Sequence, residues 1–273
     1  MSQIHPTAII HPSARLDPTV EAGPYSVVGE NVRIGAGTVL MDRVTIGKNT
    51  VIGRKNAIYT GAALGHDAQH RNAVSEGTSL VIGDENVFRE YVTVHRGFEK
   101  GGTTTIGNKN YFMAFSHAGH DSRIADGVTI ANGSLVAGHV AIESGAVLSG
   151  SVVVHQYCRI GRLAMVGGLA RVSKDVPPYF LVDDGSESVR SINLVGLKRA
   201  GFAESAVREI KRAYRLLYLS GLRLEEALEA IAKECKSAEA KHLVEFIRGS
   251  KRGILPHARH AAGETELSPV ADE

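Results

Sequence analysis

Apolar residues recur along most of this chain at a spacing of six positions. Counting from Ile4 to Val172 in steps of six gives 29 sites, and 26 of them are Ala, Val, Ile, Leu or Phe. The exceptions are His70, Glu76 and Lys100, which fall in two polar stretches. An amphipathic helix would need apolar residues every three or four positions, and a strand every two, so neither explains the pattern. A period of six is typical of the hexapeptide repeat of a parallel β-helix.

Each hexad predicts one short strand and a turn, with its apolar residue pointing into the interior. Three hexads close one triangular coil, and neighbouring coils stack about 4.8 Å apart, as paired strands do. Glycines often follow the apolar sites, as at Gly29, Gly35 and Gly47, and we expect them to take turn conformations that other residues resist. The repeat therefore predicts a mainly β protein, a prism of roughly nine coils.

The period ends after Val172, and the rest of the chain is organised differently. Residues 175–179 (DVPPY) form a rigid exit, and residues 180–200 show no period, so we expect no regular structure there. Helical spacing then predicts three helices, over residues 204–220, 223–235 and 238–249. The predicted parts are a β-helix over 1–180 with loop excursions near 66–80 and 96–104, a helical domain over 181–256, and a disordered tail over 257–273.

Composition and charge exclude several classes of function. Two cysteines, Cys158 and Cys235, provide neither a disulfide framework nor a metal cluster. A formal net charge of +2 gives no argument for binding nucleic acid. The sequence has no apolar stretch of membrane-helix length, and MSQIHPTAII lacks the pattern of a signal segment. We therefore expect a cytoplasmic protein with no transmembrane segment and no nucleic-acid partner.

Candidate chemistry lies in the histidines, of which the chain has 12. His117 and His120 flank the apolar site Ala118, and Asp121 follows His120 directly. An imidazole oriented by a carboxylate is a general base suited to neutral pH, and the small Ala118 and Gly119 would let a substrate approach closely. The alternative is a turn histidine that only hydrogen-bonds the next coil, and spacing alone leaves both interpretations open.

Three further histidines, His95, His139 and His155, follow apolar sites at coil edges. Each of these histidines alone could lie at the edge of a turn without a function. Together they indicate a cleft between neighbouring prisms packed by symmetry. Zinc hydration is the competing chemistry, because His95, His117 and His120 superficially resemble the zinc ligands of hexapeptide carbonic anhydrases. The gap between His117 and His120 is shorter than in that pattern, so we expect no metal.

Five motifs in fixed order give the chain a specific resemblance to a known family. They are H-x-x-H-D at 117–121, A-G-H-V at 137–140, H-Q-Y-C at 155–158, D-V-P-P-Y at 175–179 and G-L-K-R-A-G-F at 196–202. From residue 4 to about 250 the chain resembles the acyl-carrier-protein-dependent UDP-N-acetylglucosamine acyltransferases that open lipid A synthesis. The resemblance implies a left-handed parallel β-helix of hexapeptide repeats, a C-terminal α-helical domain and a homotrimer.

The resemblance also implies roles for individual residues. His120 matches the general base, Asp121 the carboxylate that orients it, and Gly138 the residue whose N–H holds the thioester oxyanion. Gly168 matches the residue that limits acyl-chain length. Positions matching the nucleotide-sugar and acyl cleft are His95, Gln69, His70, Asn72, His117, His139, His155, Gln156, Asn193 and Arg199. The implied reaction moves a 3-hydroxyacyl chain from the phosphopantetheine of acyl carrier protein to the 3-position of UDP-N-acetylglucosamine, with no other cofactor.

The chain departs from the family pattern in its first loop. Well-known members carry Gln-Asp-Leu-Lys where this sequence has Gln-His-Arg-Asn at 69–72, and Val195 and Ala200 replace a common glutamate and arginine. These departures do not change the predicted reaction class, which is acyl transfer. They leave two candidate acceptors, the sugar with a 3-hydroxyl group or its 3-amino analogue, and the latter would give an amide. A β-helix that acts as a non-catalytic scaffold is an alternative from another class of function. Residues that could compensate for the lost contacts are Arg71, Arg96 and Lys100.

A basic stripe is predicted on the helix expected over 204–220. Its four cations recur at i, i+3, i+4 and i+7, with only Glu209 interleaved. They are Arg208, Lys211, Arg212 and Arg215. Such stripes are usually solvated faces, but the implied donor is an acidic protein, and complementary charge speeds encounter. We therefore predict that the stripe docks acyl carrier protein.

Overall fold

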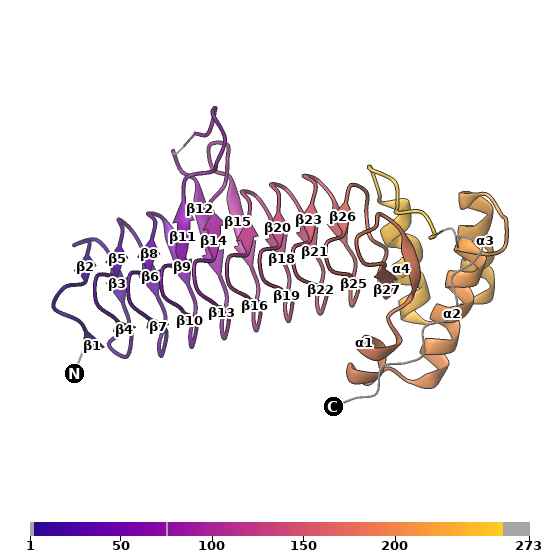
Figure 1. Cartoon of the computed structure of the whole chain (residues 1–273), viewed down its shortest axis with the longest axis horizontal. Helices are drawn as coiled ribbons and strands as arrows, with labels where there is room; N and C mark the ends of the chain where they lie inside the picture. The colour runs from indigo at the N-terminus through magenta and orange to yellow at the C-terminus, as the bar shows by residue number, and fades with distance from the viewer. Residues whose placement is uncertain (1–2, 75, 259–273) are drawn as a thin grey trace.

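The computed structural model of the protein describes residues 3–74 and 76–258. The chain winds into a long prism of short strands, with two loops projecting from one edge and helices packed at the far end (Figure 1). Strands three apart in sequence pair in parallel, so each coil contributes one strand to each of three sheets. The parallel β-helix expected from the hexapeptide repeat is therefore confirmed.

The three sheets are named A, B and C here. Sheet A comprises β1 (Gln3–Ile4), β4 (Glu21–Ala22), β7 (Val39–Leu40), β10 (Ala57–Ile58), β13 (Val87–Phe88), β16 (Tyr111–Phe112), β19 (Thr129–Ile130), β22 (Val147–Leu148), β25 (Met165–Val166), β27 (Phe180–Val182) and β28 (Val189–Ile192). Sheet B comprises β2 (Ile9–Ile10), β5 (Val27–Val28), β8 (Thr45–Ile46), β11 (Ala63–His66), β14 (Thr93–His95), β17 (His117–Ala118), β20 (Leu135–Val136), β23 (Val153–Val154) and β26 (Arg171–Val172). Sheet C comprises β3 (Arg15–Leu16), β6 (Arg33–Ile34), β9 (Thr50–Ile52), β12 (Ser79–Ile82), β15 (Thr103–Ile106), β18 (Arg123–Ile124), β21 (Ala141–Ile142) and β24 (Arg159–Ile160). The chain turns between them at the AB, BC and CA corners.

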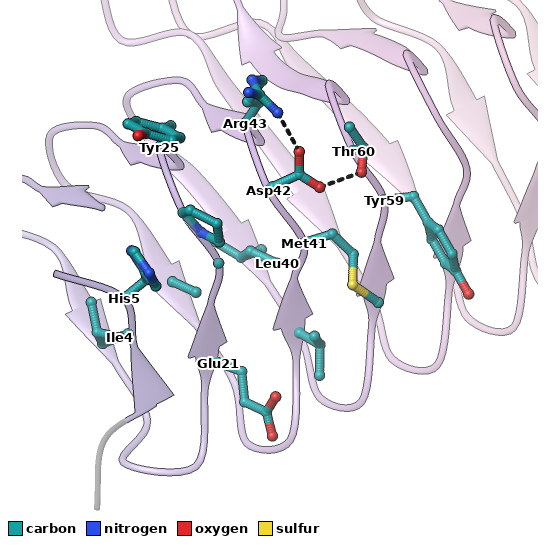
Figure 2. Close-up of a pocket in the computed structure, with 14 residues that line it drawn as sticks. Ile4, His5, Glu21, Tyr25, Leu40, Met41, Asp42, Arg43, Tyr59 and Thr60 are labelled. Atoms are coloured by element: carbon teal, nitrogen blue, oxygen red, sulfur yellow. Dashed lines mark hydrogen bonds and ion pairs between the residues drawn. The ribbon is translucent and has the colours of Figure 1, made fainter. Parts of the chain in front are cut away.

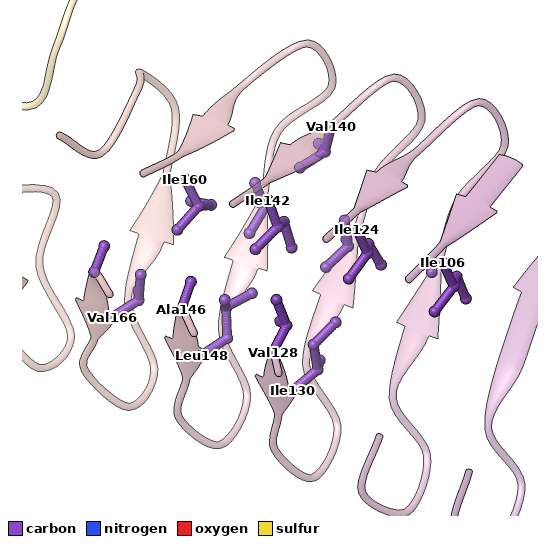
Figure 3. Packing of buried hydrophobic residues seen from close by; sticks show 14 of the residues in the cluster. Ile106, Ile124, Val128, Ile130, Val140, Ile142, Ala146, Leu148, Ile160 and Val166 are labelled. Carbon is purple, nitrogen blue, oxygen red and sulfur yellow. The ribbon is translucent and has the colours of Figure 1, made fainter. Parts of the chain in front are cut away.

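The apolar sites of the repeat fill the interior of the prism. Ile106, Ile124 and Ile142 occupy matching register positions on successive strands of sheet C, so like side chains stack along the prism axis (Figure 3). Phe88 and Phe112 stack in sheet A with ring centroids 4.8 Å apart. All five side chains are buried. Burial of apolar surface, worth roughly 25 cal/mol per Å², holds strands of only two residues in register.

The glycines that follow the apolar sites have a different role from the expected one. The left-handed backbone conformation falls two positions later, where residues such as Tyr25 (φ 59°) and Asn31 (φ 57°) adopt it. Gly35 instead lies so close to the next coil that a Cβ there would come 2.8 Å from the Gly53 carbonyl carbon. The expectation that these glycines take turn conformations that other residues resist was wrong. Glycine is required at these positions because neighbouring coils approach closely.

Residues 180–200 are regular, and the expectation of no structure there was wrong. β27 pairs in parallel with β25 and antiparallel with β28, so sheet A continues to Ile192. The helix α1 (Leu194–Arg199) follows, and the Oδ1 of Asn193 caps it by accepting the Gly196 N–H at 2.9 Å. These elements leave the six-residue period and are too short to show another one.

Three further helices pack at the end of the prism (Figure 1). They are α2 (Glu204–Tyr218), α3 (Leu224–Glu234) and α4 (Ala238–Arg248), each inside a range expected to be helical. No helix within residues 3–74 and 76–258 is long and apolar enough to span a bilayer. Of the predicted tail, His257 contacts the fold through a 2.8 Å hydrogen bond between its Nε2 and the Tyr214 hydroxyl. Residues 259–273 lie outside the described residues.

Candidate active site

Both interruptions of the six-residue period fall at the BC corner. One loop joins β11 to β12, and the other joins β14 to β15 (Figure 1). The loops are tied to each other, because the Val74 N–H donates to the Phe98 carbonyl at 3.0 Å. Glu76 and Lys100 add an exposed ion pair, with Oε1 and Nζ 2.6 Å apart. The two loops therefore form one projecting unit.

This unit brings an aromatic ring against the predicted general base. The ring centroid of Phe98 lies 5.2 Å from that of His120 and 4.6 Å from that of His70. The Phe98 N–H also donates to Asp121 Oδ2 at 2.9 Å. Phe98 was not predicted, because it lies outside the six-residue period and outside the five motifs. Its only signal is an aromatic residue in an otherwise polar loop.

The predicted pairing of His120 with Asp121 is present. His120 Nδ1 lies 2.9 Å from Asp121 Oδ2, and both side chains are largely buried. Asp121 has φ 57°, and its N–H donates to Thr104 Oγ1 at 2.7 Å, which holds its main chain against the neighbouring coil. Because Nδ1 is held by the carboxylate, Nε2 is the ring nitrogen free to accept a proton.

Gly138 lies one coil further along, against the His120 ring. A Cβ on Gly138 would come 2.6 Å from His120 Nε2, so only glycine leaves that nitrogen open. Among the described residues, the Gly138 N–H donates to no acceptor. The N–H at the same turn position of Arg162 donates to Glu143 Oε2 at 2.7 Å. An unpartnered N–H beside a general base can bind a developing oxyanion.

Two aromatic rings extend this site along the BC corner. The His139 ring is perpendicular to that of His120, with centroids 5.0 Å apart, and stacks on Tyr157 at 4.6 Å. The exposed His155 and Gln156 lie in the same coil as Tyr157, where His155 Nδ1 donates to the Gln156 carbonyl at 3.1 Å. The structure therefore brings His139 to His120, with His155 and Gln156 next along the corner. Tyr157 was not predicted.

His95 and His117 lie on sheet B beside the corner, with ring centroids 5.1 Å apart. His117 Nδ1 lies 2.8 Å from the Thr93 hydroxyl. Burial lowers the pKa of His95 to about 4, and nearby positive charge on His117 adds to the effect. Burial also lowers the pKa of His117. Both rings are therefore neutral near pH 7, which suits hydrogen bonding rather than ion pairing.

The geometry also bears on the zinc interpretation. Within the described part of the chain, one group of potential ligand atoms lies within 4.8 Å of one another, contributed by His120, Asp121 and His139. It is not the set of His95, His117 and His120 that zinc hydration would use. In the group present, His120 and Asp121 direct their polar atoms at each other.

Asn193 and Arg199 lie in a separate groove. This groove, of about 860 Å³, runs along sheet A and the CA corner and is also lined by Leu163 and Met165. Asn193 is 8% exposed, and its Nδ2 donates to the Leu163 carbonyl at 2.9 Å while its Oδ1 caps α1. Its side chain therefore has a structural role, whereas Arg199 is exposed. One copy of the chain does not bring this groove to His120.

Gly168, predicted to limit acyl-chain length, lies at the AB corner. Its N–H donates to Asp184 Oδ1 at 2.7 Å. A Cβ built there would meet only the Gly150 carbonyl oxygen, at 3.6 Å. A larger side chain at this position would therefore extend outward without a clash in its own chain.

Another groove, of about 690 Å³, lies at the N-terminal end of the prism (Figure 2). Its central carboxylate, Asp42, accepts hydrogen bonds from the Thr60 hydroxyl at 2.5 Å and from Arg43 at 2.8 Å (Figure 2). The groove contains none of the predicted site residues. Because Asp42 is already held by Thr60 and Arg43, the groove offers no free base comparable to His120.

The basic stripe on α2 is partly paired within the chain. Arg212 Nε lies 2.6 Å from Glu234 Oε2 on α3, and Arg208 Nη1 lies 3.5 Å from Glu204. Within the stripe Glu209 is the interleaved carboxylate, as expected, and the packing of α3 adds a second carboxylate that the sequence pattern did not predict. The stripe lines a groove of about 630 Å³ whose residues are Arg208, Lys211, Arg212, Arg215, Leu216, Leu219 and Ser220.

Comparison with known proteins gives consistent matches. The family profile described as UDP N-acetylglucosamine O-acyltransferase, domain 2, matches residues 175–255, and the bacterial transferase hexapeptide profile matches residues 25–60. The chain is 45% identical over 257 residues to the acyl-[acyl-carrier-protein]–UDP-N-acetylglucosamine O-acyltransferase of Halorhodospira halophila, covering 93% of this chain and 100% of that protein. Its fold is similar to the Francisella novicida UDP-N-acetylglucosamine acyltransferase (TM-score 0.88, 40% identity, 96% of this chain, 100% of that one). It is also similar to the Moraxella catarrhalis UDP-N-acetylglucosamine O-acyltransferase (TM-score 0.90, 40% identity, 93% and 99%).

Proposed function

The chain belongs to the UDP-N-acetylglucosamine O-acyltransferase family, and on this premise we propose that it transfers a 3-hydroxyacyl chain from acyl carrier protein to the 3-hydroxyl of UDP-N-acetylglucosamine. This is the first step of lipid A biosynthesis. The names of its relatives support the donor and acceptor classes. The observation that carries the chemistry is the 2.9 Å hydrogen bond between His120 and Asp121 beside the open Gly138 N–H.

In the proposed reaction His120 Nε2 removes the proton of the sugar 3-hydroxyl as its oxygen attacks the thioester carbonyl carbon. Asp121 stabilises the imidazolium that forms. The Gly138 N–H stabilises the negative charge on the carbonyl oxygen of the tetrahedral intermediate. When the C–S bond breaks, His120 returns the proton to the departing phosphopantetheine sulfur. The reaction needs no covalent enzyme intermediate and no cofactor beyond the donor's own arm.

We propose that the complete site forms between copies of the chain in a homotrimer. His120 lies at the BC corner and is not among the residues that line the groove containing Arg199, which runs along sheet A and the CA corner. A neighbouring copy could bring its Arg199 to the BC corner, where a guanidinium suits a nucleotide's phosphates. Mixing an inactive His120→Ala chain with an inactive Arg199→Ala chain should restore activity if the site is shared. Absence of restored activity in verified mixed oligomers would count against it.

The acceptor is the finer part of the proposal. The loop that departs from the family pattern places His70 beside Phe98, 6.5 Å from the His120 ring centroid. Arg96 is buried and donates to Thr78 Oγ1 and the Gly65 carbonyl, each at 2.8 Å, so it cannot replace a lost contact to substrate. The 3-amino analogue is the second acceptor to test. Incubation of the purified protein with each sugar and 3-hydroxyacyl carrier protein, read by mass spectrometry, identifies the product.

A substitution at His120 tests the catalytic assignment. His120→Ala should lower turnover roughly 10²–10⁴-fold, the usual contribution of a general base, while the protein stays folded. His11→Ala is the matched control, because His11 occupies the same corner in the first coil, is exposed, and bonds only the Ser13 side chain and N–H. No acyl product from the wild type with either sugar would contradict the function. Full activity of His120→Ala would contradict the mechanism.

We also propose that the α2 stripe docks the acyl carrier protein. Of its cations, Lys211 and Arg215 form no ion pair with the described residues, so they are the ones available to a partner. Lys211→Glu with Arg215→Glu should raise KM for the carrier protein several-fold at low salt and leave KM for the sugar unchanged. Lys233→Glu with Lys241→Glu gives the same charge change on α3 and α4. If the two double variants had equal KM values for the carrier protein, the α2 stripe would be only a solvated face and not a docking site.

Gly168 is proposed to set the length of the acyl chain. Its open surroundings allow a larger side chain to project outward from the AB corner. Gly168→Met should shift the preferred donor to shorter 3-hydroxyacyl chains, because each lost methylene of pocket depth is worth about 1–3 kcal/mol. An unchanged chain-length profile would assign that role to another residue.

A further inference from the structure

Tyr179 occupies the last turn of the CA corner and is buried there. Its φ is 71°, and Glu85 and Lys109 adopt the same left-handed conformation at this turn position in earlier coils, where both are exposed. Tyr179 is instead fully covered. Burial raises the pKa of its hydroxyl to about 12, so the hydroxyl stays protonated near pH 7. A buried hydroxyl needs a hydrogen-bond partner.

That partner comes from α4. His242 Nδ1 lies 3.0 Å from the Tyr179 hydroxyl, which keeps its proton and can donate it to this nitrogen. The other ring nitrogen, Nε2, lies 3.1 Å from Glu143 Oε2 at the CA corner. The same oxygen of Glu143 accepts the Arg162 N–H at 2.7 Å. The imidazole therefore bridges the buried hydroxyl to a carboxylate of the prism, and the two bonds fix the orientation of its ring.

Tyr179 contacts both ends of α1. Its carbonyl accepts the Asn193 N–H at 2.7 Å, and Asn193 is the residue that caps the first turn of this helix. Its ring packs edge-on against Phe202, which follows the helix, with ring centroids 6.0 Å apart. The Arg162 guanidinium also lies over the Phe202 ring, 5.5 Å from its centre. A helix of six residues is not stable alone, so contacts at its two ends determine how it lies.

The orientation of α1 matters because this helix carries Arg199. The Arg199 side chain is exposed and forms no ion pair with the part of the chain that the structure describes. It lines the groove of about 860 Å³ on sheet A together with Gly196 of the same helix. Since no other side chain holds the guanidinium by an ion pair, its place in the groove follows the place of α1.

We propose that His242 is a positioning residue for the nucleotide of the acceptor, acting through Tyr179 on α1 and Arg199. The inference rests on the proposed function, in which Arg199 meets the phosphates of the UDP-sugar. With its hydroxyl bound by His242, Tyr179 keeps its carbonyl and its ring in place, and so keeps both ends of α1 fixed. The guanidinium is then held ready for forked hydrogen bonds to a phosphate, and less conformational freedom is lost when the nucleotide binds.

Amide substitutions of His242 separate its two hydrogen bonds. The oxygen of His242→Asn can take the place of Nδ1 and accept from the Tyr179 hydroxyl, whereas the longer His242→Gln reaches the place of Nε2 and bonds Glu143. His242→Phe keeps a ring and loses both bonds. KM for the UDP-sugar should rise about tenfold in His242→Phe, the effect of losing one hydrogen bond. It should stay raised in His242→Gln and return toward the wild-type value in His242→Asn. The kcat at saturating sugar and KM for the acyl carrier protein should not change.

Two further variants separate positioning from a loss of stability. Tyr179→Phe removes only the hydroxyl, so it should raise the same KM as His242→Phe. The double variant should show no further rise, because both changes act through one hydrogen bond. Val244→Ala is the matched control, because Val244 is buried on the same helix and carries no polar group. It should lower the denaturation midpoint and leave KM for the UDP-sugar unchanged.

The outcomes separate this inference from the proposed function. An unchanged KM for the UDP-sugar in His242→Phe, or an equal rise of this KM in Val244→Ala, would overturn the positioning role. Lack of acyl transfer by the wild type would instead overturn the proposed function, and the inference is then tested by calorimetry with UDP alone. Weaker binding of UDP by His242→Phe and by Arg199→Ala than by the wild type supports it. Equal binding by the three proteins, or no binding by any of them, rejects it.

Discussion

The CA and BC corners are built from the same six-residue repeat, yet they treat their turn N–H groups differently. At the CA corner, the Arg54 N–H donates to Asp84 Oδ1 at 2.7 Å, and the Asp84 N–H donates to Asn108 Oδ1 at 2.7 Å. These two turns are thus each closed by a side chain of the next coil. At the BC corner, the Gly138 N–H is left open beside His120.

The interior of the CA corner continues the same contrast. Asn56, Asn86 and Asn110 are buried, and each carboxamide oxygen accepts a main-chain N–H of a following coil. Sheet B at the BC corner carries His95 and His117 instead, two imidazoles held neutral by burial. A repeat fold can therefore form a ladder of side-chain to main-chain hydrogen bonds on one edge and place imidazoles beside an open N–H on another.

The largest expected effect follows from closing the open corner. Gly138→Ala should reduce turnover to nearly that of His120→Ala, because the added Cβ would lie 2.6 Å from His120 Nε2. The φ of Gly138 is not in the left-handed region, so the substitution needs no strained backbone. Gly150→Ala is the control at the same turn position of the AB corner, where a Cβ meets only the Asn132 carbonyl at 3.7 Å. Steady-state kinetics check both, and an active Gly138→Ala enzyme would contradict the site geometry.

The reverse experiment removes one asparagine of the hydrogen-bonded ladder at the CA corner. It should lower stability without changing turnover. The Asn86 carboxamide donates to Asn56 Oδ1 at 3.0 Å and to the Gly107 carbonyl at 2.9 Å, and accepts the Asn110 N–H at 2.9 Å. Asn86→Ala leaves these groups unsatisfied, so the free energy of unfolding should fall by about 1–3 kcal/mol. Turnover per folded enzyme, measured below the unfolding transition, should stay at the wild-type value.

A matched control for that variant is Asn132→Ala, since Asn132 is an exposed turn residue. Its denaturation midpoint should match the wild type. If Asn86→Ala lost activity while keeping its stability, the division between a stabilising corner and a reactive corner would be wrong.

The sequence predicted what depends on local spacing. The period of six gave the prism, and the adjacency of His120 and Asp121 predicted their contact. Phe98 was missed because its position depends on two loops folding against each other, which no period records. The pairing of Arg212 with Glu234 was missed for the same reason, since 22 residues separate them and only the packing of α2 on α3 brings them together.

Some residues that the sequence assigned to one site lie far apart on a single prism. Asn193 and Arg199 were grouped with His120 by resemblance, yet they line another groove. A linear motif order contains no information on which copy of a chain supplies each residue. Their proposed meeting requires symmetry, which acts only after folding.

The effect that is smallest at neutral pH is a pH dependence of stability that arises at the BC corner. His95 is 5% exposed, and its pKa is lowered to about 4 in the folded protein, chiefly by burial. In the unfolded chain the same imidazole has a pKa of about 6.5. Between these values the unfolded state binds a proton that the folded state does not, so stability is complete above about pH 6.5 and falls as the pH decreases toward 4. His95→Asn, neutral at every pH, should show a shallower fall in its denaturation midpoint across this window. The CA carboxamides do not titrate, so Asn86→Ala should lower the midpoint and keep the wild-type slope. Equal slopes in His95→Asn and wild type would show that acid acts elsewhere in the fold.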